Sequence, residues 1–567
     1  MGSILENLTF NPSKSVLIKE EPIFNRRKLR VVCIGAGLSG LTLAHKIKNE
    51  NAFGENEVDF TIYEKNNDIG GTWYENVYPG AACDIPAHCY TFPFAPNPNW
   101  SKFMAPGAEI HKYIKDTAAK FGLEEPIQFN STVHAAVWNE ASGKWDIAVS
   151  KGGKTFDDTA DVVINATGFL SVVQWPEIEG LKDFQGKLLH TARWDKSYEW
   201  EGKKVAVIGN GSSGIQIVAA MQPKVAKLTN YLRSPTWIAP NFAADPTKDG
   251  KNFTYTEEEK ELYRTDKEAF RKYLKSIEQT INFTYFMLLK DSPVHEMVQA
   301  GCTELMKSRM VNDPELAEKM IPKFSAGCRR ISPGDGYLEA LQEPNCQANW
   351  SPIKRVTATG IETADGKTED FDLIVCATGF NTKWIPEWKL VGKHGVTLNK
   401  TWKDDPSAFL GVNVGDMPNY FLIYGPNSPV GNGSVLRACG WQCDFIVKSI
   451  NKIATEDIKS MVVKPDALLE YNEYAQKLLK RTVWSDNCRA WYKSGKESGT
   501  VTGVYQGSTL HYKGKRDRNN LIQNAGFEHF DIEYRTGNRF AYMGNGKSIR
   551  DEDGAGDLAY YMDDLEL

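Results

Sequence analysis

The chain has 567 residues, of which 41% are hydrophobic and 25% charged, and its formal net charge is −5. This composition is typical of a soluble globular protein with about three or four domain-sized units. A slightly acidic chain favours neither nucleic acid nor an anionic membrane as a partner. The sequence has no run of about 18 apolar residues, so no transmembrane helix is predicted.

The ten cysteines are scattered along the sequence, and none of them forms a C-x-x-C pair. Neither a redox-active dithiol nor a zinc ribbon is therefore expected, and no metal site is predicted. Scattered thiols in a large chain fit a reducing compartment. Because the first 21 residues lack the basic and apolar runs of a signal peptide, we expect a cytoplasmic protein.

Two segments of the chain carry the order strand, glycine motif, helix, strand. In the first, strands are predicted over residues 29–34 and 58–63, the motif GAGLSG spans 35–40 and a helix follows over 38–47. This setting is typical of a dinucleotide site. The first glycine permits a tight turn, the second lets the backbone approach the pyrophosphate, and the third packs the helix on the strand. The glycines assigned to a nucleotide are Gly35, Gly37 and Gly40.

The second segment repeats the order, with strands predicted over residues 204–208 and 228–232, the motif GNGSSG at 209–214 and a helix over 215–225. The same argument assigns a second nucleotide to this motif and to the residue that follows it, with the phosphates at the positive end of the helix. These positions are Gly209, Asn210, Gly211, Ser212, Ser213, Gly214 and Ile215.

The two segments differ at the end of their second strand. Glu64 follows the first, and a carboxylate there suits a ribose with free hydroxyls. Arg233 and Ser234 follow the second, and a cation with a hydroxyl suits a ribose that carries a phosphate. One chain is therefore predicted to hold two different nucleotides, which indicates electron transfer between them.

A charged stretch that begins near residue 255 carries apolar residues at helical spacing, among them Phe270 and Ile277. We predict that it forms a helical insertion in the second nucleotide domain. Strand character returns at residues 371–379, which repeat the Ala-Thr-Gly ending of the strand at 161–168. The two strands are expected to play parallel roles, each ending a nucleotide-domain sheet.

The sequence thus predicts an α/β fold with two Rossmann-like dinucleotide-binding domains and a helical insertion in the second. Residues 1–28 are expected to form an N-terminal extension, and the simplest connection returns the last part of the chain to the first domain. The expected boundaries are 29–172 for the first domain, 173–240 and 327–384 for the second, 241–326 for the insertion, and 385–567 for the returning part with the C-terminal segment.

The link between the two nucleotide segments has the sequence FQGKLLHTARWD at residues 184–195. By composition alone it is a linker or a docked interdomain strand. Placed just before a second nucleotide motif, it resembles F-x-G-x-x-x-H-x-x-x-W-[DP], the signature of type I Baeyer–Villiger monooxygenases, with every fixed position present. These flavoproteins use NADPH and dioxygen to turn ketones into esters or lactones. The resemblance implies FAD at the first motif and NADPH at the second.

A second match follows the first ribose acid. Residues 70–84, GGTWYENVYPGAACD, resemble the family's G-G-x-W-x-x-x-x-Y-P-G-x-x-x-D segment. Taken alone, Trp73 is a packed aromatic and Pro79-Gly80 a turn. The resemblance implies that Ala82, Cys83 and Asp84 touch the nicotinamide side. It also implies flavin-lining residues, which are Thr72, Trp73, Tyr74, Glu75, Asp84, Ile85 and Tyr90.

The third match supplies the catalytic group. Arg329 and Arg330 lie where the family has a basic pair, although two adjacent arginines are by themselves a surface patch. The resemblance makes Arg330 catalytic, with Asp84 as its partner. It makes Arg329 a ligand of the 2′-phosphate where the family usually has lysine, which keeps the charge and changes its shape. Trp491 matches a family tryptophan near the cofactor ribose, and a core aromatic is the alternative.

The resemblance also implies the course of the reaction. Reduced flavin and dioxygen give a peroxyflavin, whose deprotonated form attacks the ketone while the fixed charge of Arg330 stabilises it. Oxidised NADP stays bound and shields the site from water. The expected partners are a small-molecule ketone and dioxygen.

Three alternatives stay open. A flavin monooxygenase that oxidises nitrogen or sulfur shares the nucleotide motifs but lacks the Trp194-Asp195 ending. A dithiol reductase with FAD and NADPH would need the missing C-x-x-C pair. A non-catalytic nucleotide sensor would not need Asp84 and Arg330.

Overall fold

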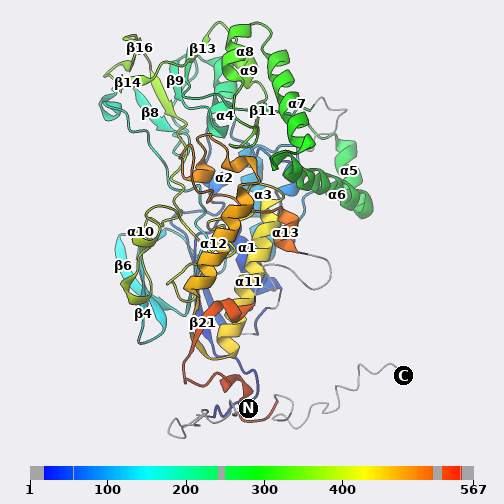
Figure 1. The fold of residues 1–567 in the computed structure, drawn as a ribbon, viewed down its shortest axis with the longest axis vertical. Helices are drawn as coiled ribbons and strands as arrows, with labels where there is room; N and C mark the ends of the chain where they lie inside the picture. The colour runs from blue at the N-terminus through cyan, green and yellow to red at the C-terminus, as the bar shows by residue number, and fades with distance from the viewer. Residues whose placement is uncertain are drawn as a thin grey trace, which may run out of the picture.

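A computed structural model of the chain describes residues 18–50, 52–54, 57–240, 250–514, 526–548 and 551. The first 17 residues of the expected extension lie outside the described ones. Two lobes are stacked along the long axis, with the first nucleotide sheet in the lower lobe of Figure 1 and the second in the upper lobe. Within the described ranges, no helix has both the length and the apolar character needed to cross a membrane.

The first nucleotide domain is built on a parallel five-stranded sheet. Its order is β19 (Tyr420–Leu422), β7 (Val162–Asn165), β1 (Leu29–Ile34), β2 (Val58–Tyr63) and β3 (Ile127–Gln128). β1 and β7 are almost wholly buried, because helices cover one face of the sheet and a smaller β-layer covers the other. The helix after the glycine motif, α1 (Leu38–Asn49), packs against α11 (Val435–Thr455) and α3 (Gly107–Phe121). The bounds predicted for β1 and β2 are confirmed.

The second nucleotide domain has a similar parallel sheet. Its order is β13 (Cys346–Asn349), β10 (Lys227–Tyr231), β9 (Lys204–Ile208), β17 (Leu373–Cys376) and β8 (Lys187–His190). The helix predicted over residues 215–225 is α4 (Ser212–Met221), which begins inside the glycine motif and ends before Pro223. Both predicted ends were wrong, because the motif opens the helix and a proline cannot continue it.

The two Ala-Thr-Gly strands have parallel roles, but the expectation that each ends its sheet was wrong. β7 lies between β19 and β1, and β17 lies between β9 and β8. Each of them pairs with the strand that precedes a glycine motif. β8 occupies the edge of the second sheet, so the linking segment at residues 184–195 begins as a docked strand.

Smaller elements surround these sheets. β4 (Ser131–Asn139), β5 (Lys144–Lys151), β6 (Lys154–Ala160) and β18 (Lys389–Val391) form one layer, and β14 (Ile353–Val356), β15 (Gly360–Thr363) and β16 (Thr368–Asp370) form another. The other elements are α2 (Thr72–Glu75), β11 (Ile238–Ala239), β12 (Ser332–Pro333), α9 (Tyr337–Ala340), α10 (Leu398–Thr401), β20 (Ile458–Val463), α12 (Pro465–Leu479), α13 (Thr509–Lys513) and β21 (Phe530–Tyr534).

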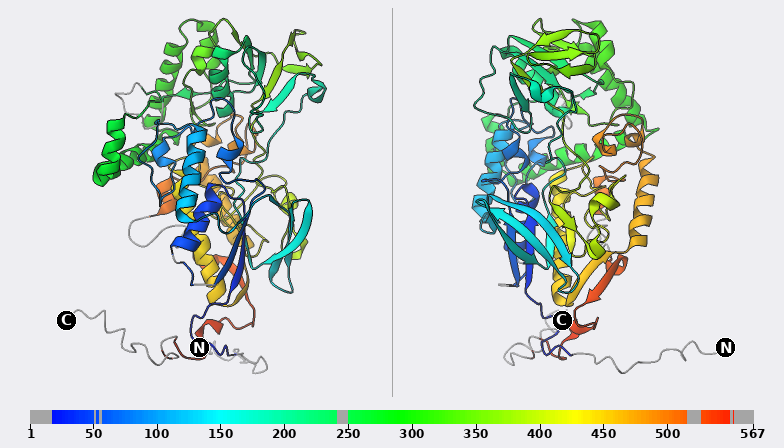
Figure 2. Two further views of the ribbon diagram at one scale, coloured as in Figure 1. Left: turned by 180° about the vertical axis from the view of Figure 1, so that it is seen from behind. Right: turned by 90° about the vertical axis from the view of Figure 1, so that its left-hand side faces the viewer.

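The helical insertion packs on both lobes. Its described helices are α5 (Glu257–Thr265), α6 (Lys267–Phe283), α7 (Pro293–Arg309) and α8 (Pro314–Met320). Ile277 and Ile281 of α6 join the core of the first lobe, whereas Met306 of α7 and Met320 of α8 join that of the second. In Figure 2 the green insertion extends from the upper lobe to the level of the blue first-domain elements. The insertion therefore spans the junction between the lobes.

The C-terminal part divides in the same way. Ile446 and Ile450 of α11 lie in the core of the first lobe. Trp484, Tyr492 and Val504, which follow α12, lie in the core of the second lobe. This part of the chain therefore covers the junction as well as the first sheet.

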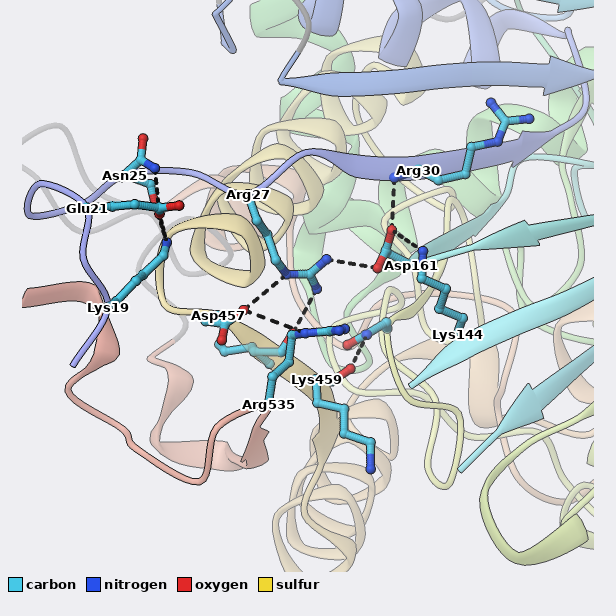
Figure 3. Close-up of polar contacts among 12 residues, drawn as sticks. Lys19, Glu21, Asn25, Arg27, Arg30, Lys144, Asp161, Asp457, Lys459 and Arg535 are labelled. Carbon is cyan, nitrogen blue, oxygen red and sulfur yellow. Dashed lines mark hydrogen bonds and ion pairs between the residues drawn. The ribbon is translucent and has the colours of Figure 1, made fainter. Parts of the chain in front are cut away.

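A buried carboxylate ties the segment before β1 to the first sheet (Figure 3). Asp161, 1% exposed, accepts hydrogen bonds from Nη1 of Arg27 and from the backbone amide of Arg30, each at 2.9 Å. Lys144 Nζ lies 3.4 Å from the same carboxylate. Burial raises the pKa of Asp161, but the amide of Arg30 and the charges of Arg27 and Lys144 outweigh burial, so the net pKa is lowered.

Replacing Asp161 with Asn should destabilise the first lobe, because Arg27 then lacks its buried partner. We expect the thermal unfolding midpoint at pH 7 to fall by roughly 5 °C. A lowered pKa stabilises the fold only while the group is ionised, so the deficit should be full above about pH 4 and shrink below it. The exposed Asp59, which pairs with Arg30 at 3.0 Å, provides the control. An equal loss in Asp59→Asn contradicts the role given to Asp161.

Candidate active site

A cavity of about 1730 Å³ lies where the two lobes meet. Both glycine motifs line it, together with the loop after the insertion and part of the C-terminal segment. Most site residues predicted from the sequence also line it. They are Gly35, Gly37, Glu64, Thr72, Trp73, Glu75, Ala82, Cys83, Asp84, Ile85, Tyr90, Gly209, Asn210, Gly211, Ser212, Ser213, Arg233, Ser234, Arg329, Arg330 and Trp491.

Four of the predicted residues do not line the cavity. A Cβ at Gly40 or Gly214 would overlap a carbonyl oxygen of the preceding turn, so these glycines pack helix on strand. Ile215 lies in the core of the second lobe. Tyr74 turns away and donates to Oδ1 of Asn67 at 2.5 Å. Consecutive side chains on a helix point about 100° apart, so the Tyr74 side chain points away from those of Trp73 and Glu75, which line the cavity.

The first motif forms a cradle for phosphates. Gly35 has a φ of +106°, and a Cβ there would lie 2.8 Å from the carbonyl oxygen of Ala166, so only glycine fits. α1 begins after Gly37 with no acidic residue in its first turn and no side chain capping it. The free N–H groups and the positive dipole end of α1 are therefore available to a pyrophosphate.

Glu64 follows β2 and lines the same cavity, with 4% of its surface exposed. Its carboxylate accepts the backbone N–H of Ala36 at 2.7 Å and that of Asn66 at 2.9 Å. Burial raises the pKa of Glu64, against these two hydrogen bonds. Each oxygen keeps a further lone pair, so the side chain can still accept ribose hydroxyls.

The second motif repeats the cradle. Gly209 has a φ of +112°, and a Cβ there would lie 2.6 Å from the carbonyl oxygen of Ala377. A Cβ at Gly211 would meet no atom within 4 Å, so the backbone of Gly211 is open to a ligand. Asn210 donates to the carbonyl oxygen of Ser234 at 2.8 Å, which joins the motif to the end of β10.

The cavity wall beyond the second motif is cationic. Arg329 Nη1 donates to Oγ of Ser234 at 3.0 Å, and Arg233 lines the same wall. Burial and the charge of Arg233 lower the pKa of Arg329. Within the described residues neither arginine has an ion pair with a carboxylate. A wall of unpaired guanidinium groups suits a phosphate.

Arg330 and Asp84 form a bidentate ion pair in the cavity. Nε of Arg330 donates to Oδ2 of Asp84 at 3.0 Å, and Nη2 donates to Oδ1 at 2.8 Å. Burial disfavours the charge of Arg330, but Asp84 outweighs burial and the pKa of Arg330 is raised. The side chains keep 31% and 24% exposure, so the pair remains accessible from the cavity.

Two consecutive aromatic residues of the C-terminal segment, Trp491 and Tyr492, line the same cavity. Trp491 lines the cavity and stacks on Phe169, with ring centroids 5.3 Å apart. Tyr492, which the sequence did not single out, is 3% exposed, and burial raises the pKa of its hydroxyl against the charge of Arg330. Trp491 is therefore a wall of the site rather than only a core aromatic.

A polar joint connects the two nucleotide domains beside Asp84. The hydroxyl of Tyr78 donates to Oε1 of Gln216 at 2.7 Å, and Nε2 of Gln216 donates to the carbonyl oxygen of Ala82 at 3.0 Å. Gly80 packs so closely on α4 that a Cβ would lie 2.7 Å from the carbonyl oxygen of Gln216. The Tyr-Pro-Gly turn thus sets the position of Asp84 relative to the second motif.

The signature segment at residues 184–195 lies outside the cavity. His190 is fully buried and accepts the N–H of Ala192, and burial lowers its pKa to about 4. Asp195 accepts from Nζ of Lys187 at 2.5 Å, and this bond is the main cause of its pKa of about 2. The signature therefore marks the scaffold that joins the lobes.

The insertion and the C-terminal part supply further cavity walls. Residues 430–433, 435 and 436 line the cavity, whereas the preceding Asn427 and Ser428 are buried at 1% exposure. The apolar residues of these walls include Ile281, Met287, Leu288, Val430, Leu436 and Trp484. The described residues contain no group of three His, Cys, Asp or Glu side chains placed to hold a metal ion.

A disulfide joins Cys328 to Cys488, next to the loop that carries Arg329 and Arg330. The sequence predicted only scattered thiols, because 160 residues separate the two cysteines and no local pattern pairs them. The other eight cysteines are free.

Comparisons with known proteins agree with this site. The sequence matches the flavin-binding monooxygenase-like (FMO-like) family over residues 28–246. It is 51% identical over 545 residues to the FAD-binding monooxygenase tazF of Aspergillus terreus, covering 95% of this chain and 96% of that protein. It is 33% identical over 502 residues to a Baeyer–Villiger monooxygenase of Streptomyces coelicolor, covering 87% and 92%. The fold resembles cyclohexanone monooxygenase from Rhodococcus sp. Phi1 bound to NADP+, with a TM-score of 0.76, 25% identity, and 90% and 100% of the two chains covered.

Substitutions at two glycines of the second motif should have different effects, one on stability and the other on nucleotide binding. Gly214→Ala places a Cβ against the carbonyl oxygen of Gly209, so we expect the thermal unfolding midpoint to fall by more than about 3 °C. Gly211→Ala is compatible with the φ of −74° and should fold normally. It should bind NADP+ about 10-fold more weakly by calorimetry, because a methyl group obstructs the pyrophosphate. If Gly211→Ala binds NADP+ as tightly as the wild type, the assignment of NADP+ to the second motif is contradicted.

Proposed function

This chain belongs to the family of FAD-binding Baeyer–Villiger monooxygenases, and from that premise we propose that it converts a ketone into an ester or lactone. The net reaction consumes the ketone, NADPH, one proton and dioxygen, and yields the ester, NADP+ and water. The observation that carries the proposal is the bidentate Arg330–Asp84 pair in the cavity that both glycine motifs share. An oxygen nucleophile that attacks a carbonyl needs such a permanent cation.

We assign FAD to the first motif and NADPH to the second. The open N-terminus of α1 and the two lone pairs left on Glu64 fit the pyrophosphate and ribose of FAD. The unpaired guanidinium groups of Arg233 and Arg329 fit the 2′-phosphate of NADPH. Bound FAD, once reduced by NADPH, supplies the electrons that activate dioxygen.

Arg330 acts as a fixed positive charge. Its guanidinium keeps its proton throughout, since Asp84 raises a pKa that is already high. Asp84 occupies two N–H donors and holds the planar group in one orientation, which leaves further N–H donors for oxygen atoms that gain negative charge. The apolar walls from the insertion and the C-terminal part would exclude water around the ketone, which strengthens this interaction.

Oxidation of nitrogen or sulfur is the alternative. A soft nitrogen or sulfur atom attacks without building negative charge on a carbonyl, so it does not require a paired arginine in the cavity. The Arg330–Asp84 pair therefore favours ketone oxidation. We further propose a cytoplasmic enzyme, because eight of the ten cysteines are free and the one bridge, Cys328–Cys488, is buried away from reducing thiols. A net charge of −5 favours a small-molecule substrate over nucleic acid.

Ketone oxidation is tested with the purified, FAD-loaded protein. We expect ketones from a panel between cyclohexanone and steroids to stimulate NADPH consumption and to give esters or lactones. Labelled dioxygen should leave one labelled oxygen atom in the ester, read by mass spectrometry. Oxidation of amines and sulfides alone, with no ester from any ketone, would overturn the proposal.

Arg330→Ala should separate flavin reduction from oxygen insertion. We expect NADPH to reduce the flavin at close to the wild-type rate in anaerobic stopped-flow, while ester formation falls at least about 100-fold. Arg330→Lys keeps the charge but loses the bidentate geometry, so it should recover only part of the product. An unchanged ester yield per NADPH in Arg330→Ala contradicts the role of Arg330.

A further inference from the structure

A third arginine lines the cavity wall beyond the second motif. Arg489, from the C-terminal segment, joins Arg233 and Arg329 among the cavity-lining residues. Arg489 is an exposed residue, and its Nη1 donates to the carbonyl oxygen of Gly495 at 3.3 Å. None of the three has an ion pair with a carboxylate anywhere in the described ranges. Three cations from three separate segments thus meet without an acidic partner.

The disulfide holds together the two segments that carry Arg329 and Arg489. Arg329 follows Cys328 directly and Arg489 follows Cys488 directly, and the bridge holds the two cysteines with their Cα atoms 6.3 Å apart. Both cysteines are buried, at 0% and 3% exposure. Buried Lys493 reinforces the joint, since its Nζ lies 3.9 Å and 3.8 Å from the two sulfur atoms and donates to the carbonyl oxygen of Asp486.

We propose that Arg489 is a third arginine ligand of the 2′-phosphate of NADPH, held beside Arg329 by the Cys328–Cys488 bridge. The inference rests on the proposed NADPH site at the second motif. A phosphate monoester dianion has three oxygens to satisfy, and guanidinium groups bind them with directed, charge-assisted hydrogen bonds. The bridge orders Arg489 before the ligand arrives, so binding does not have to bring a loose segment into place.

The charges themselves support this role. Burial lowers the pKa of Arg233, and the charge of Arg489 lowers it further. Burial and the charge of Arg233 lower the pKa of Arg329 in the same way. Like charges held together destabilise the empty site, and a bound dianion removes that repulsion. The same segment carries Trp491, so a phosphate held by Arg489 would also fix a wall of the cavity.

Binding of 2′,5′-ADP and of 5′-AMP to the FAD-loaded protein tests Arg489 without turnover. Arg489→Ala should reduce the affinity for 2′,5′-ADP by roughly 10-fold and that for 5′-AMP by less than about 2-fold, as measured by calorimetry. The affinity of Arg489→Lys for 2′,5′-ADP should lie between those of the wild type and Arg489→Ala. Lys496→Ala is the matched control, because Lys496 belongs to the same segment, pairs with Asp405 at 3.2 Å and does not line the cavity. Equal losses for both ligands, or no loss for 2′,5′-ADP, would overturn the role of Arg489.

The bridge is tested with the double variant Cys328→Ser and Cys488→Ser. This variant should bind 2′,5′-ADP roughly 3–10-fold more weakly than the wild type. Arg489→Ala added to it should reduce the affinity by a smaller factor than Arg489→Ala does in the wild type. Full 2′,5′-ADP affinity in the double variant would overturn the positioning role of the bridge. If the wild-type protein itself does not distinguish 2′,5′-ADP from 5′-AMP, the NADPH assignment fails, which is a different outcome from an unaffected Arg489→Ala variant.

Discussion

The ion pair between Arg330 and Asp84 is the interaction on which the rest of the site depends. Asp84 belongs to the first nucleotide domain, and Arg330 lies where the insertion rejoins the second, so the pair forms only when both domains are in place. A half-buried arginine without its carboxylate would carry a desolvation cost of several kcal/mol. The Tyr78–Gln216 joint, the close approach of Gly80 to α4 and the insertion that spans the junction all hold the lobes in the arrangement that satisfies this pair.

The most specific motif of the sequence builds the scaffold and does not line the cavity. The signature segment is the most specific pattern in the sequence, yet His190 and Asp195 lie outside the cavity and have pKa values that keep them respectively neutral and ionised near pH 7. Their partners are a backbone amide and Lys187 within the same segment. A motif can therefore identify a family because it builds a link between two domains, even where it does not line the cavity.

What the sequence predicted well was local. β1 and β9 are buried apolar runs that lead into glycine turns, and β2 is a partly buried strand. The bounds of all three depend on neighbours in the chain. Contacts across the chain could not be predicted in this way. Tyr78 and Gln216 are 138 residues apart, and Cys328 and Cys488 are 160 apart. Tyr74 was wrongly assigned to the site because the direction of one side chain on a one-turn helix follows from packing. Arg330 was assigned to the site by the family resemblance, since two adjacent arginines alone would have indicated a surface patch.

Arg329 and Arg330 show how position, rather than residue type, decides the role of a charge. Arg330 has an internal counter-ion, so its charge is permanent and its geometry is set before any ligand binds. Arg329 has a hydroxyl partner and a like-charged neighbour, so its electrostatic energy improves only when an anion arrives. In the proposed function, one charge is therefore preorganised for reacting oxygen atoms, while the other recruits the phosphate of the ligand. Adjacent positions on one loop can serve both purposes because successive side chains point to different walls of the same cavity.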